Sequence, residues 1–140
     1  PALRPPPVGI QALAPARWHD RLGRAGEADR YSLAALETAD PWTRREALSG
    51  YTMLLKSAGR RQEALPGWDE WGSLAPEDPT PAIELAKHYE WHERDYGRAV
   101  LWAERAQGSL THWPVDWRRR AMQDAIEHRL ARLRRKNALG

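Results

Sequence analysis

The sequence contains no cysteine, no phenylalanine and only two methionines among its 140 residues. Without cysteine the chain can have neither a disulfide framework nor a thiolate zinc site, so we expect a reducing, cytoplasmic setting. Without phenylalanine, the apolar core must be built from leucine, alanine and the eight tryptophans. Hydrophobic residues make up 41% of the chain and charged residues 29%, which is typical of a folded protein rather than a disordered one.

Long hydrophobic runs are also missing. The uninterrupted apolar runs are only a few residues long, whereas a membrane-spanning helix needs roughly 20 apolar residues. No secretory signal pattern is present. We therefore expect no membrane partner, and the length fits a single domain of the usual size, roughly 100–150 residues.

Patterns for β-structure and for common catalytic sites are absent as well. The sequence has no alternating β-branched runs and no Asn-Gly hairpin. No serine lies in a Gly-x-Ser-x-Gly elbow, and Gly23-Arg-Ala-Gly lacks the strand and the Lys-Ser/Thr of a phosphate-binding loop. The sequence thus predicts an all-α chain that needs no cofactor and carries no catalysis of its own.

The chain is instead rich in proline, above all at its start. Four of the first seven residues are proline, and the chain starts at Pro1 rather than at methionine. We interpret residues 1–14 as a proline-rich linker and the chain as a fragment of a longer protein. Residues 15–137 are then predicted to form one helical domain.

Prolines and glycines divide this domain into helices. Asp40-Pro41 supplies an N-cap carboxylate followed by a proline at the first helical position, and Thr80 before Pro81 is predicted to be the next cap. Pro66-Gly67 falls inside a predicted helix, so that helix either kinks or begins late. The predicted helices are Ala16–Leu22 with Pro15 as first residue, Glu27–Ala39, Pro41 to Gly59, Arg61–Leu74, a pair within Pro81–Ala106, and Pro114–Asn137.

An internal repeat is the strongest pattern. Gly23-Arg-Ala-Gly-Glu-Ala28 and Gly59-Arg-Arg-Gln-Glu-Ala64 share Gly-Arg-x-x-Glu-Ala at a distance of 36 residues, and Arg94-Asp-Tyr-Gly-Arg-Ala99 follows 35 residues later. In each, a tight turn precedes a small residue that lets the second helix lie close to the first. A two-helix period in the mid-thirties is typical of tetratricopeptide-like repeats. The sequence predicts an α-solenoid of about three such hairpins and a C-terminal capping helix.

One stretch of the repeat resembles a narrower family. Glu84-Leu-Ala-Lys-His-Tyr-Glu-Trp-His-Glu-Arg-Asp-Tyr-Gly-Arg-Ala99, followed by Trp102-Ala-Glu-Arg-Ala106, is similar to the C-terminal helical-repeat tail of bacterial proteins whose N-terminal domain has an RNase H-like, exonuclease-type fold. The resemblance covers roughly residues 16–135, and Pro66-Gly67 departs from its pattern. It implies a non-catalytic module attached to a metal-dependent nuclease-like domain, whose acidic metal ligands are not in this chain.

Two histidines of the central hairpin raise the possibility of a metal site. His88 and His92 are four residues apart on a predicted helix, as zinc-binding pairs are, and Glu84 lies one turn earlier. The order is His-Tyr-Glu-Trp-His rather than His-Glu-x-x-His, and the sequence places no third ligand. A helical metalloenzyme at His88 and His92 is therefore the remote alternative, and structural or surface histidines are the favoured interpretation.

Tryptophans are the candidates for partner contacts. Trp68 with Trp71, and Trp113 with Trp117, have helical spacing, which predicts packing between neighbouring helices. Tryptophan is also enriched at binding hot spots. We predict Trp42 and Trp91 as partner-binding residues, because they flank apolar positions rather than falling on them.

The last predicted helix concentrates positive charge. It has a local net charge of +5 within a chain of net charge +3. A basic strip of this kind binds nucleic-acid phosphates by counterion release, but a charged outer face also keeps a capping helix soluble. The candidate phosphate ligands are Arg118, Arg119, Arg120, Arg129, Arg132, Arg134, Arg135 and Lys136.

Together these patterns predict a non-catalytic protein-interaction or scaffolding module. Its partner would be a protein, a peptide or the parent chain's own N-terminal domain, held on a concave face lined by the first helix of each hairpin. The alternative is an accessory nucleic-acid-binding domain that uses the basic C-terminal helix.

Overall fold

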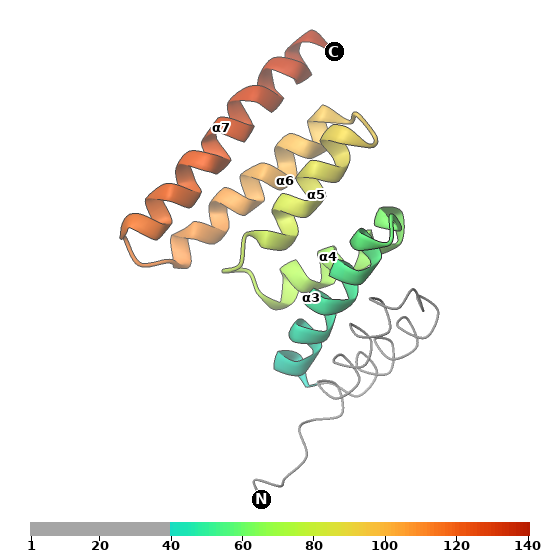
Figure 1. The fold of residues 1–140 in the computed structure, drawn as a ribbon. Helices are drawn as coiled ribbons and strands as arrows, with labels where there is room; N and C mark the ends of the chain where they lie inside the picture. Colours follow the sequence, from blue (N-terminus) through green and yellow to red (C-terminus); the bar gives the residue numbers. More distant parts are fainter. Residues whose placement is uncertain (1–39) are drawn as a thin grey trace, which may run out of the picture. The chain divides into compact units, whose positions relative to one another are not determined.

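The computed structural model describes residues 40–140, and every regular element in this part of the chain is helical (Figure 1). Helices adjacent in sequence pack together: α3 with α4, α5 with α6, and α6 with α7. The all-α prediction is confirmed for these residues, whereas the proline-rich entry and the first predicted hairpin lie outside them. The elements are α3 (Pro41–Ser57), α4 (Arg61–Leu74), α5 (Thr80–Trp91), α6 (Tyr96–Ser109), the short 3-10 helix η1 (Leu110–His112) and α7 (Trp117–Leu139).

The chain divides into two compact units between Leu74 and Ala75, and each is described by itself. The first contains the α3–α4 hairpin, and the second contains α5, α6 and α7. Among residues 40–140, no helix combines the length and the apolar character that crossing a membrane requires.

The α3–α4 hairpin begins and turns as its sequence predicts. The carboxylate of Asp40 accepts a hydrogen bond from the backbone N–H of Thr43 at 2.8 Å and so caps α3. Gly59 follows the end of α3 with φ of +75°, a conformation that glycine adopts without steric cost. The buried apolar side chains are those of Ala47, Leu48, Leu54, Leu55, Ala64, Trp68 and Trp71.

Helix α4 runs from Arg61 to Leu74 with Pro66 inside it, so the proline does not delay its start. Pro66 is exposed, and Gly67 faces α3. A Cβ atom at Gly67 would lie 2.6 Å from Cγ2 of Thr52, which is buried and bonded through its hydroxyl to Leu48 O at 2.7 Å. The glycine therefore permits a close approach of α4 to α3.

The core of the second unit is made of small residues on α5 and α6 and larger ones on α7. Alanines allow the first two helices to lie close together, and the α7 side chains fill the space that remains. Tyr89, Tyr96, Trp102 and Met122 pack against this core from its edge. The buried set is Ala82, Ala86, Ala99, Ala103, Ala106, Leu110, Ile126, Leu130 and Leu133.

The turns of the two described hairpins correspond in detail. Gly59 and Arg94 both have a left-handed backbone, with φ of +75° and +53° respectively. Each precedes by five residues an alanine that is 0% exposed, Ala64 in one hairpin and Ala99 in the other. The repeat seen in the sequence is thus a repeat of turn geometry and of close helix packing in these two hairpins.

Two predicted helix starts are wrong. Thr80 is the first residue of α5 rather than its cap, and its N–H donates to the carboxylate of Asp78 at 3.0 Å. Helix α7 begins at Trp117 rather than Pro114, because Asp116 caps it by accepting from the N–H groups of Arg118 and Arg119 at 2.9 and 3.2 Å. In α7 the carboxylate of Asp116 supplies a cap that a proline side chain, which accepts no hydrogen bond, cannot. The residue before α5 is Pro79, and α5 has no side-chain cap.

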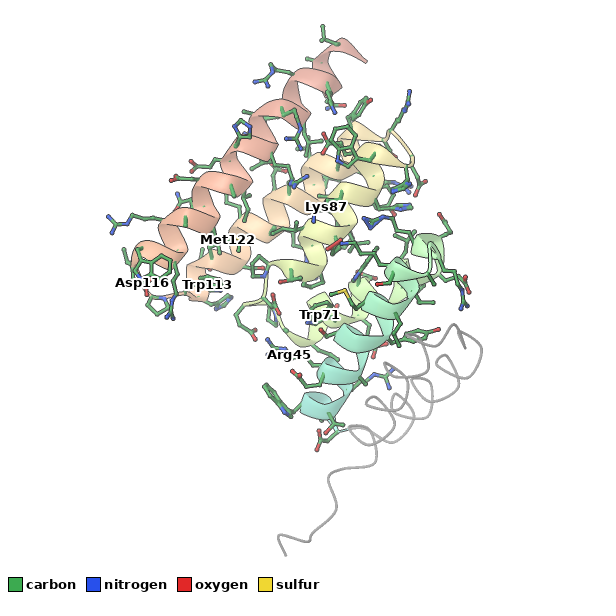
Figure 2. All side chains as sticks on the ribbon, in the orientation of Figure 1. Arg45, Trp71, Lys87, Trp113, Asp116 and Met122 are labelled. Atoms are coloured by element: carbon green, nitrogen blue, oxygen red, sulfur yellow. The ribbon has the colours of Figure 1, made fainter. Side chains whose placement is uncertain are left out.

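The predicted packing of tryptophans is confirmed for one pair and wrong for part of the other. Trp68 and Trp71 are buried, at 2% and 8% exposure. Trp113 lies before α7, where its indole N–H donates to Glu77 O at 2.7 Å. Figure 2 labels it, with Asp116, at the end where α7 begins. Trp117 is 68% exposed, because the later start of α7 places it outside the core.

Candidate functional site

Glu90 is the most unusual charged residue of the second unit. It lies near the end of α5, and its side chain is 0% exposed. Arg132 donates two hydrogen bonds to its carboxylate, both at 2.9 Å, and Lys136 donates one at 2.8 Å. Arg129 adds a longer contact at 3.3 Å. Three cations from α7 thus surround one buried carboxylate from α5, and we call these four residues the Glu90 cluster.

Within the Glu90 cluster, Arg132 and Lys136 stabilise the charge of Glu90, whereas Arg129 is held less favourably. Burial by itself raises the pKa of Glu90, but the hydrogen bonds and charges of Arg132 and Lys136 outweigh it, so this pKa lies below its usual range. The hydrogen bond with Glu90 raises the pKa of Arg132. Burial, followed by the charge of Arg132, lowers the pKa of Arg129. Glu90 therefore stays ionised and holds the cationic face of α7 against α5.

The remaining basic residues of α7 have varied surroundings. Arg134 pairs with Glu104 of α6 at 3.1 Å, and Arg119 donates to Trp113 O at 3.1 Å. The guanidinium of Arg118 lies 5.5 Å from the ring centroid of Trp117. Arg120 and Arg135 are exposed.

These contacts make several of the predicted phosphate ligands less available to a nucleic acid. Arg129, Arg132 and Lys136 bind an internal carboxylate, and Arg134 is paired with a second one. A phosphate would have to compete with Glu90 for three of the eight candidates, because their donors already serve a buried anion. The exposed basic residues that remain are spread along α7 from its first turn to Arg135.

The histidines predicted as a possible metal pair lie side by side, His88 in the last turn of α5 and His92 immediately after the end of that helix. Their rings are stacked, with centroids 5.6 Å apart. His88 is buried, and its Nε2 lies 2.6 Å from a carboxylate oxygen of Glu93, whereas His92 is exposed. Within residues 40–140, no three histidine, cysteine or carboxylate side chains lie close enough together to hold a metal ion.

The two tryptophans predicted to contact a partner are both exposed. Trp42, in the first turn of α3, is 61% exposed, and Arg45 lies over its ring. Trp91, the last residue of α5, is 56% exposed. Its ring lies beside the Glu90 cluster, with Lys136 Nζ 4.0 Å from the ring centroid. Trp91 is thus partly engaged by an internal cation, and the two residues belong to different units.

Sequence patterns did not point to a surface groove in the second unit. It has a volume of about 390 Å³ and lies along the exposed edge of α5 and α6. Residues 98, 101, 102 and 105 share one face of α6, because they are spaced by three and four along the helix. Leu101, which is 65% exposed, lies in the middle of this row. The lining residues, which define the α5–α6 groove, are Tyr89, Arg98, Leu101, Trp102 and Arg105.

Each end of the α5–α6 groove has an arginine over an aromatic ring. The guanidinium of Arg98 lies 5.6 Å from the ring centroid of Tyr89, and that of Arg105 lies 5.1 Å from the ring of Trp102. Asp95 lies 3.4 Å from Arg98 in an exposed pair. The groove thus offers an apolar centre between two cations.

No protein-family model matches the chain, and no curated protein sequence is significantly similar to it. The resemblance to the helical tail of RNase H-like proteins therefore stays a prediction from the residues quoted above. The candidate site rests on the geometry of the chain itself.

Proposed function

We propose that the chain is a non-catalytic, tetratricopeptide-like module that binds a protein partner. The observation that carries this proposal is the α5–α6 groove, where an exposed leucine lies between two arginines placed over aromatic rings. Aromatic residues and arginine are the types most enriched at protein interfaces and binding hot spots. A solvent-exposed leucine in a concave site gains free energy when a partner covers it.

The arrangement of the helices as a tetratricopeptide-like solenoid is part of this proposal. The matching turns at Gly59 and Arg94 support a series of equivalent hairpins, as a solenoid requires. Trp42 and Trp91 remain candidate contacts, because large exposed aromatic side chains suit an interface. A parent protein with an RNase H-like domain would supply one partner, its own N-terminal domain.

The alternative function is nucleic-acid binding by the basic C-terminal helix. Its support is the exposure of Arg118, Arg120 and Arg135 on α7. The Glu90 cluster weighs against it, because three of the candidate phosphate ligands already bind a buried carboxylate. We therefore place protein binding first.

Two measurements on the 140-residue chain test the proposal. A random peptide display library is selected on the immobilised chain, and selected peptides are synthesised and titrated by fluorescence anisotropy. We expect saturable binding of one peptide class. In parallel, labelled single-stranded and double-stranded oligonucleotides are titrated from about 50 to 200 mM salt, the range over which phosphate-driven binding weakens most visibly.

The two titrations separate the functions. Peptide binding without oligonucleotide binding near 50 mM salt supports the interaction module. Tight, steeply salt-dependent oligonucleotide binding, lost in the Arg118→Gln/Arg120→Gln/Arg135→Gln variant and unaccompanied by peptide binding, would replace it with the nucleic-acid function.

A further inference from the structure

We infer that the α5–α6 groove binds an acidic peptide segment in which an apolar side chain lies between two carboxylates. This inference rests on the proposed function and names the partner's chemistry. The groove lies on the exposed face of the second helix of its hairpin, so it differs from the concave face that the repeat pattern predicts. Its occupant follows from the charge, the apolar surface and the spacing of the lining residues.

The positive charge of the groove favours an anionic partner. Arg98 and Arg105 project from one face of α6, and Arg105 forms no ion pair with a carboxylate within residues 40–140. Glu104, next to it in sequence, is paired with Arg134 instead. A guanidinium stacked over a ring keeps the N–H groups in its own plane available, so it can still bind a carboxylate with two parallel hydrogen bonds. The groove can therefore bind an anion directly at Arg105, whereas at Arg98 a partner's carboxylate would take the place of the exposed carboxylate of Asp95, which lies 3.4 Å away.

The apolar centre excludes a purely ionic ligand. Leu101 is 65% exposed and lies between the two arginines on α6, with Trp102 beside it. The volume of about 390 Å³ is at the small end of the range of ligand sites, roughly 300–1,000 Å³, which fits a few side chains rather than a whole domain. A leucine, phenylalanine or tryptophan of the partner would cover this surface.

Ring geometry favours a peptide over a nucleic acid. Single-stranded nucleic acids bind such surfaces by stacking a base on an open aromatic face. Over both Tyr89 and Trp102, a guanidinium already lies where a base would stack. A peptide needs no open ring face, because its carboxylates bind the edges of the guanidinium groups and its apolar side chain contacts Leu101.

Spacing sets the sequence of the peptide. The α-carbons of residues seven apart on a helix are separated by about 10 Å along its axis. A peptide in the polyproline II conformation advances about 3.1 Å per residue and brings every third side chain to the same side, because this helix has three residues per turn. Carboxylates three residues apart therefore match Arg98 and Arg105. The apolar side chain falls at one of the two positions between them.

The test uses fluorescein-labelled peptides with the core Glu-Leu-Ser-Glu in Gly-Ser flanks, titrated into the full chain by anisotropy at about 50 mM salt. Comparison peptides replace both glutamates with glutamine, replace leucine with serine, or make the two glutamates adjacent. We expect binding of the first peptide and at least about tenfold weaker binding of the other three, since a charge-assisted hydrogen bond is worth about a factor of ten.

Variants locate the binding. Arg98→Gln and Arg105→Gln are each expected to weaken binding about tenfold, and Leu101→Ser to weaken it severalfold. Arg135→Gln is the matched control, because it removes the same charge from an exposed position on α7 outside the groove, and we expect less than about a twofold change. Circular dichroism confirms that each variant is folded.

The binding of the peptides to the variants decides whether the inference holds. Loss of binding in the groove variants but not in Arg135→Gln supports the inference. Binding that is insensitive to Arg98 and Arg105, or absent for every acidic peptide, overturns it, and the proposed function stands if display-selected peptides still bind elsewhere. If no peptide class binds at all, both proposals fail. Oligonucleotide binding that requires Arg98 and Arg105 would make a nucleic acid the occupant and overturn the inference.

Discussion

At the scale of single residues, Glu90 is buried because cations from α7 take the place of the water that its carboxylate would otherwise need. Ionised groups are very costly to bury alone, and a cluster of charge-assisted hydrogen bonds offsets that cost. Arg129, Arg132 and Lys136 keep 21–29% of their side-chain surface exposed. The carboxylate therefore depends on the cations more than the cations depend on the carboxylate.

Replacing Glu90 tests its contribution to stability. Glu90→Gln removes the negative charge of the side chain but keeps its shape. The three cations of the Glu90 cluster then repel one another without an anion between them. We expect the free energy of unfolding to fall by about 3 kcal/mol, at the low end of the range for breaking a buried ion pair, because the cations retain access to water. Urea unfolding followed by circular dichroism measures it.

The control for that substitution is Glu104→Gln. Glu104 of α6 pairs with Arg134 of α7, so this pair also joins α7 to a neighbouring helix, but both side chains are about half exposed, at 46% and 56%. Exposed pairs contribute about 0–1 kcal/mol. If both substitutions cost the same, the burial of Glu90 would have no special role.

Acid should weaken the protein through the same residue. The pKa of Glu90 is lowered in the folded state from its ordinary value of 4.5. Its contribution to stability is thus fully present above that value and is lost as the pH falls below it, through the folded-state pKa. We expect the urea midpoint of the wild type to decline from about pH 4.5 downward.

The Glu90→Gln variant isolates this effect, since it lacks the titrating carboxyl and should decline less over the same pH range. The pKa values of Glu70, hydrogen-bonded to Arg44, and of Asp40, the cap of α3, are also lowered and act in the same direction. They persist in the variant. Equal acid sensitivity of the two proteins would show that Glu90 is not the carboxyl responsible.

At the scale of helices, the close approach of α4 to α3 depends on Gly67. Alanine normally favours a helix over glycine by about 1 kcal/mol, but here its Cβ would lie 2.6 Å from Cγ2 of the buried Thr52. We expect Gly67→Ala to destabilise the chain by about 1–3 kcal/mol, the usual cost of overpacking. Thermal and urea unfolding provide the measurement.

A double-mutant cycle tests whether the contact with Thr52 causes the loss of stability expected for Gly67→Ala. Thr52→Ser removes Cγ2 and keeps the hydroxyl that bonds to Leu48 O. In the Thr52→Ser background, Gly67→Ala is expected to be neutral or stabilising, because the clash is gone and the helix propensity remains. The same loss in both backgrounds would mean that the contact with Thr52 does not limit the packing.

Many helix limits were predictable, and the reasons are local. The cap at Asp40-Pro41 and the turn at Gly59 follow from chemistry that acts over a few residues, and the start of α4 follows from that turn. The start of α7 was misplaced because Pro114 is also an allowed first residue, and the choice of Asp116 depends on its two backbone hydrogen bonds. Neighbouring cap candidates cannot be ranked from sequence alone.

The Glu90 cluster and the α5–α6 groove were not predicted, because they join residues of different helices. Glu90 is 39 to 46 residues away from its cations. One signal was available for the cluster: Glu90 continues the buried stripe of Ala82 and Ala86 at a spacing of four, and a charge on an apolar stripe requires a partner. The groove depends on how Tyr89 approaches α6, which periodicity does not describe.

At the scale of the whole molecule, the second unit has a core of its own and should fold alone. Residues 75–140 contain the buried cluster shared by α5, α6 and α7. We expect this fragment to be helical by circular dichroism and to unfold cooperatively, with no more than about 3–5 kcal/mol of stability, as is usual for so short a chain.

The matched control is a fragment of residues 75–128. It retains the α5–α6 hairpin but lacks Leu130, Leu133 and the cations that surround Glu90. We expect it to be largely unfolded, because the first half of α7 that it retains would leave the core open and a carboxylate unpaired. A folded shorter fragment would show that the second half of α7 is dispensable for this unit.

The arrangement around Glu90 also fixes how far α7 can slide along its neighbours. Its cations stand at spacings of three and four, and no other set of basic residues on α7 repeats that pattern. Displacement by four residues, about one helical turn, would bring Ala125 and His128, or Leu133 and Gly140, to the carboxylate in place of two of the cations. A shift of three residues toward the C-terminal end would still bring Leu139 to the place of Lys136. A single acidic residue thus selects one register of a long, mostly polar helix that apolar contacts alone would hold less uniquely.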